Sequence, residues 1–306
     1  MLSAIVTVTL LVPDVGAAER AYRQSLSYHL VERCQVALEQ AAGWGAEALA
    51  GRDCALLQPA SGEAVYLRLV ETDAAPAPAL KSLGWNATEI LVEDPALLAP
   101  RLAGSAFRVI GPPAPLQINP AVTAMQALGP AGELLYFTRM PAGKSKFGLG
   151  SATTFVDRIF IVVAGARDIR RTLDFYATTF GLPVTEPTPS SVEVLAEAWG
   201  LPREQPFLIG VVRLPARFLI EVDQYPSGAT TPKVAPGELP AGMAMVTFAV
   251  DSLEPFLSRL VAPPLALPGP PYDGRRLGVM KGPDGEAIEL IESGPPESRP
   301  APGGTP

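Results

Sequence analysis

The chain has 306 residues, of which 48% are hydrophobic and 18% charged, and this composition predicts a folded globular protein of about two domains. A net charge of −7 and a pI near 4.9 exclude nucleic acid as a partner, because no dense basic patch is present to neutralise phosphates. No apolar run reaches the roughly 18 residues of a membrane helix, so we predict no membrane partner and a cytoplasmic location. The two cysteines, Cys34 and Cys54, indicate neither a disulfide framework nor a zinc site and are interpreted as buried fillers.

The first 140 residues contain two successive patterns of strand, helix and three strands. Residues 5–12 are β-branched and apolar, and a break at Pro13 precedes a predicted helix over residues 16–27. Further strands are predicted at 28–32, 54–58 and 64–71. After an alanine- and proline-rich linker at 74–79, a second unit follows, with a strand at 87–92, a helix at 94–102 and strands at 107–110, 123–128 and 134–138.

The second half repeats this order after a link rich in glycine, lysine and serine. We predict a strand at 158–163, a helix at 168–180 and strands leading to 217–223. A second linker at 226–240 precedes a strand at 243–250, a helix at 252–260 and a hairpin that ends at 287–291. The predicted domains are therefore residues 1–140 and 155–293, joined by a linker at 141–154 and followed by a disordered tail at 294–306.

Two pairs of matching segments indicate an internal duplication. Ala21-Tyr22 parallels Phe175-Tyr176, and the segment GPAGELLYF at 129–137 parallels GPDGEAIEL at 282–290. The Gly-Pro-x-Gly sequences are typical of a tight turn between two strands. The matching segments lie about 153 residues apart in both cases, so the two halves are predicted to share one fold.

The chain resembles the vicinal oxygen chelate superfamily, which contains glyoxalases, bleomycin resistance proteins and extradiol dioxygenases. The resemblance covers residues 4–293 and depends on four short motifs: Val12-Pro13-Asp14-Val15, Phe175-Tyr176, Gly181-Leu182 and Ile288-Glu289-Leu290. It implies an α+β fold of four βαβββ units in two tandem glyoxalase-like halves with curved mixed sheets.

Members of this superfamily bind a divalent ion through histidine and glutamate side chains on inward-facing strand positions. The resemblance maps these positions onto Arg158, Glu221, Met245 and Glu289 in the second half and onto Thr7, Arg68, Ala87 and Tyr136 in the first. Only Glu221 and Glu289 can ligate an ion as expected, and the one histidine, His29, lies away from these positions. We therefore predict no metal and no cofactor.

A first candidate site combines Arg158, Glu221 and Glu289 in one cavity, with Met245 in contact with the substrate. Two carboxyl groups that share a partly dry pocket can hold one proton and act as acid and base. Arg158 would stabilise developing negative charge or dock a substrate carboxylate. The alternative is a structural arginine–glutamate bridge that replaces the metal.

A second candidate set in the first half is formed by Trp85, Glu89, Arg68 and Tyr136. Trp85 would give a flat apolar wall and Tyr136 a hydroxyl group, as in a pocket for an aromatic ligand. Ordinary core packing with one internal salt bridge is the alternative interpretation.

The resemblance and these residues lead to two main hypotheses about function. One is a metal-independent isomerase or lyase that acts by proton transfer on a small apolar oxygenated or aromatic compound. The other is a non-catalytic binding protein that sequesters such a compound, as bleomycin-resistance-type members do. A pseudoenzyme with a filled cavity and, should the strand register differ, a metal-dependent glyoxalase or dioxygenase are further alternatives. The expected partner is a small molecule, and the chain is expected to be a monomer or a homodimer.

Overall fold

The chain forms four units of strand, helix and three further strands, as the sequence predicts. The computed structural model describes residues 1–117, 119–215 and 217–294. The first unit consists of β1 (Leu2–Val12), α1 (Val15–Leu26), β2 (His29–Gln35), α2 (Leu38–Gly43), η1 (Glu47–Leu49), β3 (Asp53–Gln58) and β4 (Tyr66–Glu71). The second consists of β5 (Gly84–Val92), α3 (Pro95–Leu102), β6 (Arg108–Leu116), β7 (Asn119–Leu128) and β8 (Leu134–Arg139).

The second half has the same order, with α5 at the place that α2 has in the first unit. Its third unit consists of β9 (Val156–Ala166), α4 (Ile169–Phe180), β10 (Thr188–Ser191), α5 (Glu193–Ala198), β11 (Pro206–Arg213) and β12 (Leu219–Gln224). The fourth unit consists of β13 (Gly242–Val250), η2 (Glu254–Arg259), β14 (Leu265–Ala266), β15 (Arg276–Lys281) and β16 (Ala287–Glu292). The predicted α+β fold of two curved mixed sheets is thereby confirmed.

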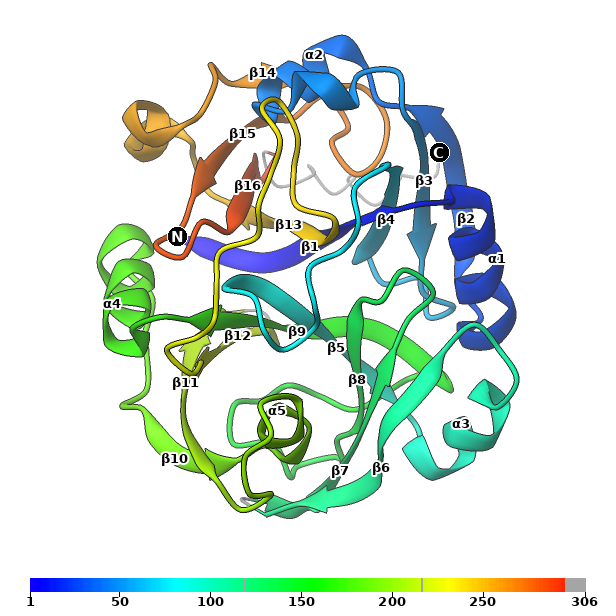
Figure 1. Cartoon of the computed structure of the whole chain (residues 1–306). Coiled ribbons are helices and arrows are strands. Elements are labelled where there is room, and N and C mark those ends of the chain that lie inside the picture. The colour runs from blue at the N-terminus through cyan, green and yellow to red at the C-terminus, as the bar shows by residue number, and fades with distance from the viewer. Residues whose placement is uncertain (118, 216, 295–306) are drawn as a thin grey trace, which may run out of the picture.

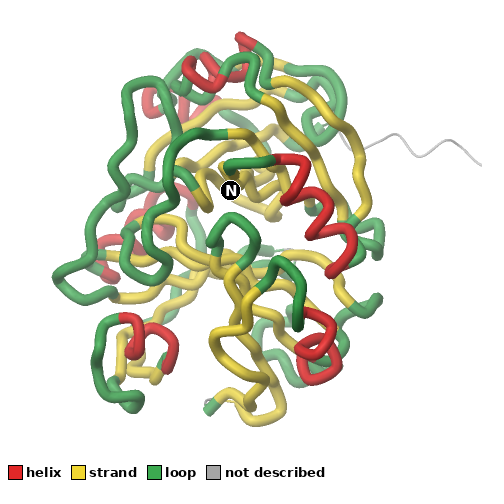
Figure 2. The backbone as a smooth tube through the Cα atoms, turned by 45° about the vertical axis from the view of Figure 1, so that its right-hand side comes forward, coloured by secondary structure: helices red, strands yellow, loops and turns green. Residues whose placement is uncertain are grey.

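The two sheets do not follow the two sequence halves. The upper sheet in Figure 1 has the order β14-β15-β16-β13-β1-β4-β3-β2, and so joins the fourth unit to the first. The lower sheet has the order β10-β11-β12-β9-β5-β8-β7-β6 and joins the third unit to the second. In each sheet, the first strands of two units pair antiparallel at the centre, β1 with β13 and β5 with β9. Figure 2 shows these two layers of strands, with most of the helices at the outside.

In each of the first three units, an aspartate that follows the first strand caps the N-terminus of the next helix. Asp14 accepts a hydrogen bond from the backbone N–H of Ala17 at 2.7 Å, and Asp94 and Asp168 cap α3 and α4 in the same way. Such a cap satisfies one of the free N–H groups at a helix start and stabilises the helix by about 1 kcal/mol. These aspartates therefore fix the point at which each unit changes from strand to helix.

Each of the two duplicated helix segments contacts one of the two duplicated hairpin turns, and these contacts link the two sheets. The Tyr22 hydroxyl on α1 donates to Glu133 Oε1 at 2.7 Å, in the turn between β7 and β8. The Tyr176 hydroxyl on α4 lies 3.4 Å from Glu286 Oε1, in the equivalent turn between β15 and β16. Burial raises the pKa of Glu133 and of Glu286 to about 7. Each helix tyrosine thus binds a buried carboxyl group on the opposite sheet.

The linkers between units lie side by side and connect the upper sheet to the lower one at the front of Figure 1. The backbone N–H of Leu83 donates to the Thr230 carbonyl at 3.0 Å, and Ser82 forms an isolated parallel β-bridge with Thr230.

No helix in the described ranges combines the length and the hydropathy that crossing a membrane requires.

Three segments differ from the predictions. The helices α2 and α5 lie in stretches without a clear pattern, and the predicted helix over 252–260 is the short 3-10 helix η2. The predicted disordered tail lies outside the described residues, apart from Gly294.

Candidate functional site

The inner face of the upper sheet carries a cavity of about 180 Å³ between the first and fourth units. Its walls come from β2, β3, β4, the α2 region and the loop between β14 and β15. The lining residues are mostly apolar, with one arginine, one glutamine and one glutamate: Glu32, Cys34, Ala37, Gln40, Trp44, Cys54, Leu56, Arg68, Leu267, Pro268, Pro270, Pro271 and Tyr272. Because an apolar cavity of about 150 Å³ accommodates benzene, this space suits a single ring with a small substituent.

Arg68 on β4 lies between two aromatic rings at this cavity. Its guanidinium carbon is 5.2 Å from the centre of the Trp44 ring and 5.1 Å from that of Tyr272. Such cation–π contacts contribute from about 0.5 to 2 kcal/mol each, with the larger values at desolvated sites. Burial alone would lower the pKa of Arg68, but Tyr272 and Glu289 oppose that effect and leave the pKa raised. The side chain is therefore a fixed, planar cation.

Glu289 on β16 is fully buried and surrounded by donors. Its Oε1 accepts hydrogen bonds from the Trp44 indole N–H at 2.7 Å and from the Tyr272 hydroxyl at 2.8 Å. Its Oε2 accepts one from the Thr247 hydroxyl at 2.5 Å and lies 3.5 Å from Arg68 Nη1. Both oxygens of this carboxylate therefore already have hydrogen-bond donors within the protein.

Arg68 keeps an unused donor. Its Nη1 donates to the Thr9 hydroxyl at 3.3 Å, whereas its Nη2 has no hydrogen-bond partner in the described part of the chain. A buried donor without a partner costs about 1 to 3 kcal/mol, and a charged one costs more. Nη2 is itself buried, so a ligand oxygen that came to lie against it would gain a charge-assisted hydrogen bond beside an apolar wall.

A disulfide between Cys34 and Cys54 forms part of the cavity wall, which corrects the interpretation of both cysteines as unpaired fillers. The two residues are directly opposite each other on the antiparallel strands β2 and β3, with their Cα atoms 5.0 Å apart. Their separation of 20 residues shows no motif, so only the strand register brings them together.

The lower sheet collects acidic side chains instead. Burial and the neighbouring Glu221 raise the pKa of Glu89 to about 8, and burial raises that of Glu221 to about 7. Asp223 is buried with Oδ1 unpaired within the described ranges, and burial, followed by Glu221 and Glu89, raises its pKa well above the usual range. Tyr136 is half-buried next to these groups, and burial and Asp223 raise its pKa. This acidic cluster contains Glu89, Glu221, Asp223 and Tyr136.

The predicted grouping of Arg158, Glu221 and Glu289 is wrong, because Glu221 lies on the lower sheet and Glu289 on the upper. Arg158 lies at the beginning of β9, five residues before Val163, which pairs with Glu221. The position equivalent to Thr7 is Ile161, since Thr9 pairs with Arg68 as Val163 pairs with Glu221. The position that the sequence predicts in β9 is therefore three residues away from the equivalent of Thr7.

Arg158 instead is fully buried away from the cavity and the acidic cluster. Its Nη2 donates to the Leu149 carbonyl at 2.8 Å, and its guanidinium carbon is 5.8 Å from the Phe218 ring. Burial lowers the pKa of Arg158, and the nearby Arg217 adds to the effect. Its Nε and Nη1 atoms are buried without a hydrogen-bond partner among the described residues.

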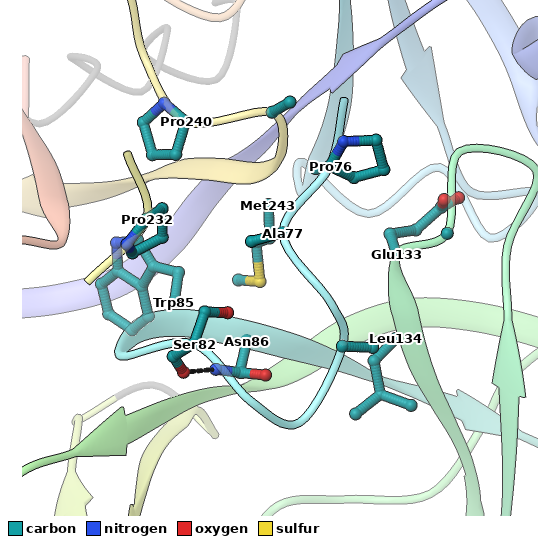
Figure 3. Close-up of a pocket in the computed structure, with 14 residues that line it drawn as sticks. Pro76, Ala77, Ser82, Trp85, Asn86, Glu133, Leu134, Pro232, Pro240 and Met243 are labelled. Atoms are coloured by element: carbon teal, nitrogen blue, oxygen red, sulfur yellow. Dashed lines mark hydrogen bonds between the residues drawn. The ribbon is translucent and has the colours of Figure 1, made fainter. Parts of the chain in front are cut away.

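The predicted set of Trp85, Glu89, Arg68 and Tyr136 is also divided. Glu89 and Tyr136 are together on the lower sheet, but Arg68 is on the upper sheet with Glu289. Trp85 lies where the two sheets meet and lines a small pocket (Figure 3). Its indole N–H donates to the Ala287 carbonyl at 2.7 Å. A β-bulge between Trp85 and Ala87 reverses the side-chain alternation and turns Trp85 away from Glu89.

Met245 lies on the upper sheet, as predicted, but is fully buried in a small core with Trp44 and Val279. The side chain next to Glu289 is that of Thr247, two residues further along β13. The cavity beside Trp85 holds about 30 Å³, which is room for no more than one or two water molecules.

The sequence reasoning missed Trp44, Tyr272 and Thr247 in the upper cavity and Asp223 in the lower sheet. Thr247 and Asp223 follow the mapped positions Met245 and Glu221 by two residues, so strand alternation could have found both. Trp44 and Tyr272 come from segments without strand periodicity, and no sequence signal places them at Glu289.

The residues present do not fit the divalent ion that the fold implies. At the four equivalent positions the upper sheet has Thr7, Arg68, Met245 and Glu289, and the Arg68 cation lies where an ion would have to bind. In the described ranges, no three histidine, cysteine or carboxylate side chains are grouped closely enough to hold a metal.

Comparison with known proteins identifies the fold. The family profile of the Glyoxalase/Bleomycin resistance protein/Dioxygenase superfamily matches residues 158–290. Glyoxalase I from Zea mays is 13% identical, with a TM-score of 0.62 over 94% of this chain and 92% of that one. A putative dioxygenase from Bacillus subtilis is 12% identical, with a TM-score of 0.61 over 96% and 86%.

At these identities the structural likeness shows the fold alone, and no curated protein is significantly similar to this chain in sequence. The profile match to residues 158–290 and the fold match over nearly the whole chain confirm the predicted resemblance to the vicinal oxygen chelate superfamily.

Proposed function

We propose that this protein binds a small, mostly apolar compound with one hydrogen-bond-accepting oxygen in the upper-sheet cavity, without a metal ion. The observation that carries the proposal is the state of Arg68. This buried guanidinium lines the cavity, is held between two aromatic rings, and has one nitrogen without a partner among the residues described. A ligand carbonyl or carboxylate oxygen would give that donor its missing partner.

The size and lining of the cavity support a ring-shaped ligand. Leu56, the prolines and the disulfide provide apolar contact, and Gln40 and Glu32 are the polar groups apart from Arg68 and the Tyr272 hydroxyl. Such a lining, mostly apolar with a few polar groups, is typical of small-molecule sites. Binding without turnover is favoured because the buried Glu289 carboxylate already faces four donors, on Trp44, Tyr272, Thr247 and Arg68.

The test is a binding screen with matched compounds. Benzoate and acetophenone, which each have an accepting oxygen, are compared with toluene by the quenching of tryptophan fluorescence and by calorimetry. A hydrogen bond to a charged group contributes about 1.5 to 3 kcal/mol, so the oxygen-containing compounds are expected to bind at least about tenfold more tightly.

The variant Arg68→Lys keeps the charge opposite Glu289 but loses the planar guanidinium, and it is expected to remove this preference. Arg213→Lys is the matched control, because Arg213 contacts the Phe147 ring at 5.4 Å on the lower sheet. Equal affinities for toluene and benzoate, or equal affinities in wild type and Arg68→Lys, would contradict the proposal.

A second candidate function is proton transfer, as in an isomerase or lyase. It is supported by the hydrogen bond from the Tyr272 hydroxyl to Glu289, which connects a cavity-lining group with a buried carboxylate. Burial raises the pKa of Tyr272 and keeps its hydroxyl protonated, so it would take part as a neutral O–H group and not as a base. Conversion of a bound compound in the same screen, and its loss in Tyr272→Phe, would favour this function over simple binding.

A further inference from the structure

The Cys34–Cys54 disulfide lies in the wall of the upper-sheet cavity and not in a closed core. Both cysteines line the upper cavity, and the bond ties β2, the outermost strand of the upper sheet, to β3. Cys54 is buried, at 4% exposed, whereas Cys34 is half-buried. A disulfide that small molecules can reach is more easily reduced than one enclosed in a core.

The strand register places this disulfide close to the proposed ligand. Leu56 pairs with Arg68 across β3 and β4, and Cys54 lies two residues before Leu56, on the same face of β3. Diagonal neighbours on one face of a sheet are about 7 to 8 Å apart, within reach of a long side chain such as that of Arg68. A compound in the cavity would therefore contact both the disulfide and Arg68.

We propose that the Cys34–Cys54 disulfide is a thiol-exchange site, which small thiols reach through the upper-sheet cavity. A thiolate RS⁻ attacks the Sγ atom of Cys34, the more exposed partner, and the Sγ atom of Cys54 leaves as a thiolate and takes up a proton. A second thiolate then attacks the mixed disulfide, releases RSSR and leaves Cys34 as a thiol. Two small thiols are oxidised to one disulfide while the protein disulfide is reduced to two thiols.

Exchange at this site changes the cavity wall. Without the bond, the outermost strand β2 loses its covalent link to β3 next to the cavity and is held by its ladder hydrogen bonds and by the contact of Arg33 with Glu19 on α1. The cavity-lining residues Glu32 and Cys34 then have more freedom to move. Reduction is therefore expected to weaken ligand binding. This consequence rests on the proposed function, whereas the exchange reaction itself does not.

The experiment measures the rate of reduction in the folded full-length protein with 2-mercaptoethanol as the probe, followed by alkylation and mass spectrometry. Ala37→Trp places a large ring at the edge of the cavity, and it is expected to slow reduction about tenfold by blocking access. Glu39→Trp is the matched control, since Glu39 is exposed two residues away and does not line the cavity, and it is expected to leave the rate unchanged.

A second readout locates the transient adduct of the thiol, which is expected on Cys34 and not on Cys54. A disulfide that opens only in denaturant, equal rates in Ala37→Trp and Glu39→Trp, or an adduct on Cys54 would each overturn the proposal. No ligand is needed for this assay, and the binding screen uses the oxidised protein. A failure of the exchange reaction is thus distinguishable from a failure of the proposed function.

Discussion

Arg68 and Glu289 form a buried ion pair. Both oxygens of Glu289 accept hydrogen bonds, whereas Nη2 of Arg68 has no partner among the described residues. Glu289 receives hydrogen bonds from Trp44, Tyr272 and Thr247 in addition to its contact with Arg68. Removing one partner of a buried pair leaves an uncompensated charge and is more harmful than the net contribution of the pair suggests. Glu289 is therefore expected to determine the stability of the cavity, and Arg68 its affinity for a ligand.

Glu289→Gln is expected to destabilise the protein by about 3 kcal/mol, because it leaves Arg68 unpaired and replaces an acceptor oxygen by an NH₂ group that faces donors. Urea unfolding followed by circular dichroism measures the change. Glu186→Gln serves as the control, since Glu186 and its partner Arg170 are both exposed and the free energy of unfolding should not change measurably. Equal stability of the two variants would show that the buried pair is not structurally important.

The sequence predicts which polar side chains face inward, but not which of them meet. Arg68 and Glu289 were recognised as inward-facing polar residues, since strand alternation fixes the face on which a side chain lies. Their pairing was missed because the sequence does not state which units share a sheet. Trp44 and Tyr272, which complete the site, lie in an irregular segment and a proline-rich loop, where periodicity carries no information.

At the scale of elements, the strands that follow clear patterns were found close to their actual bounds, but the register within them was less secure. The predicted strand at 158–163 is the middle of β9, which runs from Val156 to Ala166. Because β9 begins before Arg158, this residue lies near the start of the strand and not at the inward position assigned to it. The bulge in β5 places Trp85 on the face of the strand opposite to Glu89. A local irregularity of this kind depends on the partner strand and leaves little trace in the sequence.

The acidic cluster on β5 and β12 predicts how stability depends on pH. In the unfolded chain Glu89 and Glu221 titrate at about pH 4.3, as free glutamates do, whereas the folded pKa values are about 8 and about 7. The folded state thus binds more protons across this window, so the free energy of unfolding falls as the pH rises from about 4.5 to about 8 and then levels off. Glu133 and Glu286, with pKa values of about 7, act in the same direction.

The variant Glu89→Gln isolates the cluster from those other groups. It is expected to raise the melting temperature at pH 8, to change it little at pH 5, and so to flatten the pH dependence without abolishing it. Glu204→Gln, at an exposed position, controls for the loss of one negative charge. Parallel curves for wild type and Glu89→Gln between pH 5 and pH 8 would mean that Glu89 is not protonated in the folded protein.

At the scale of the whole molecule, four similar units can pair in several ways, and their sequences do not distinguish between them. Every unit has the same order of elements, so the linear pattern suggested two halves of adjacent units. The chain instead pairs the first unit with the fourth and the second with the third. Each sheet therefore contains strands from both sequence halves, and the cavity between β2 and the β14–β15 loop depends on both as well.

This arrangement predicts that the two sequence halves do not fold independently. A fragment of residues 1–140 would contain β1 and β5 without their antiparallel partners β13 and β9, and so would expose two apolar central strands as edges. Expressed alone, the fragment is expected to aggregate or to self-associate, as measured by light scattering during gel filtration.

Co-expressed with residues 141–294, the fragment of residues 1–140 is expected to form a one-to-one complex that recovers the cooperative thermal unfolding of the intact chain. Because the ion pair of Arg68 with Glu289 and the hydrogen bond of Trp44 to Glu289 join the two fragments, the tryptophan fluorescence of that complex should match that of the intact protein. A monomeric 1–140 fragment with its own cooperative transition would instead establish the first half as an autonomous domain.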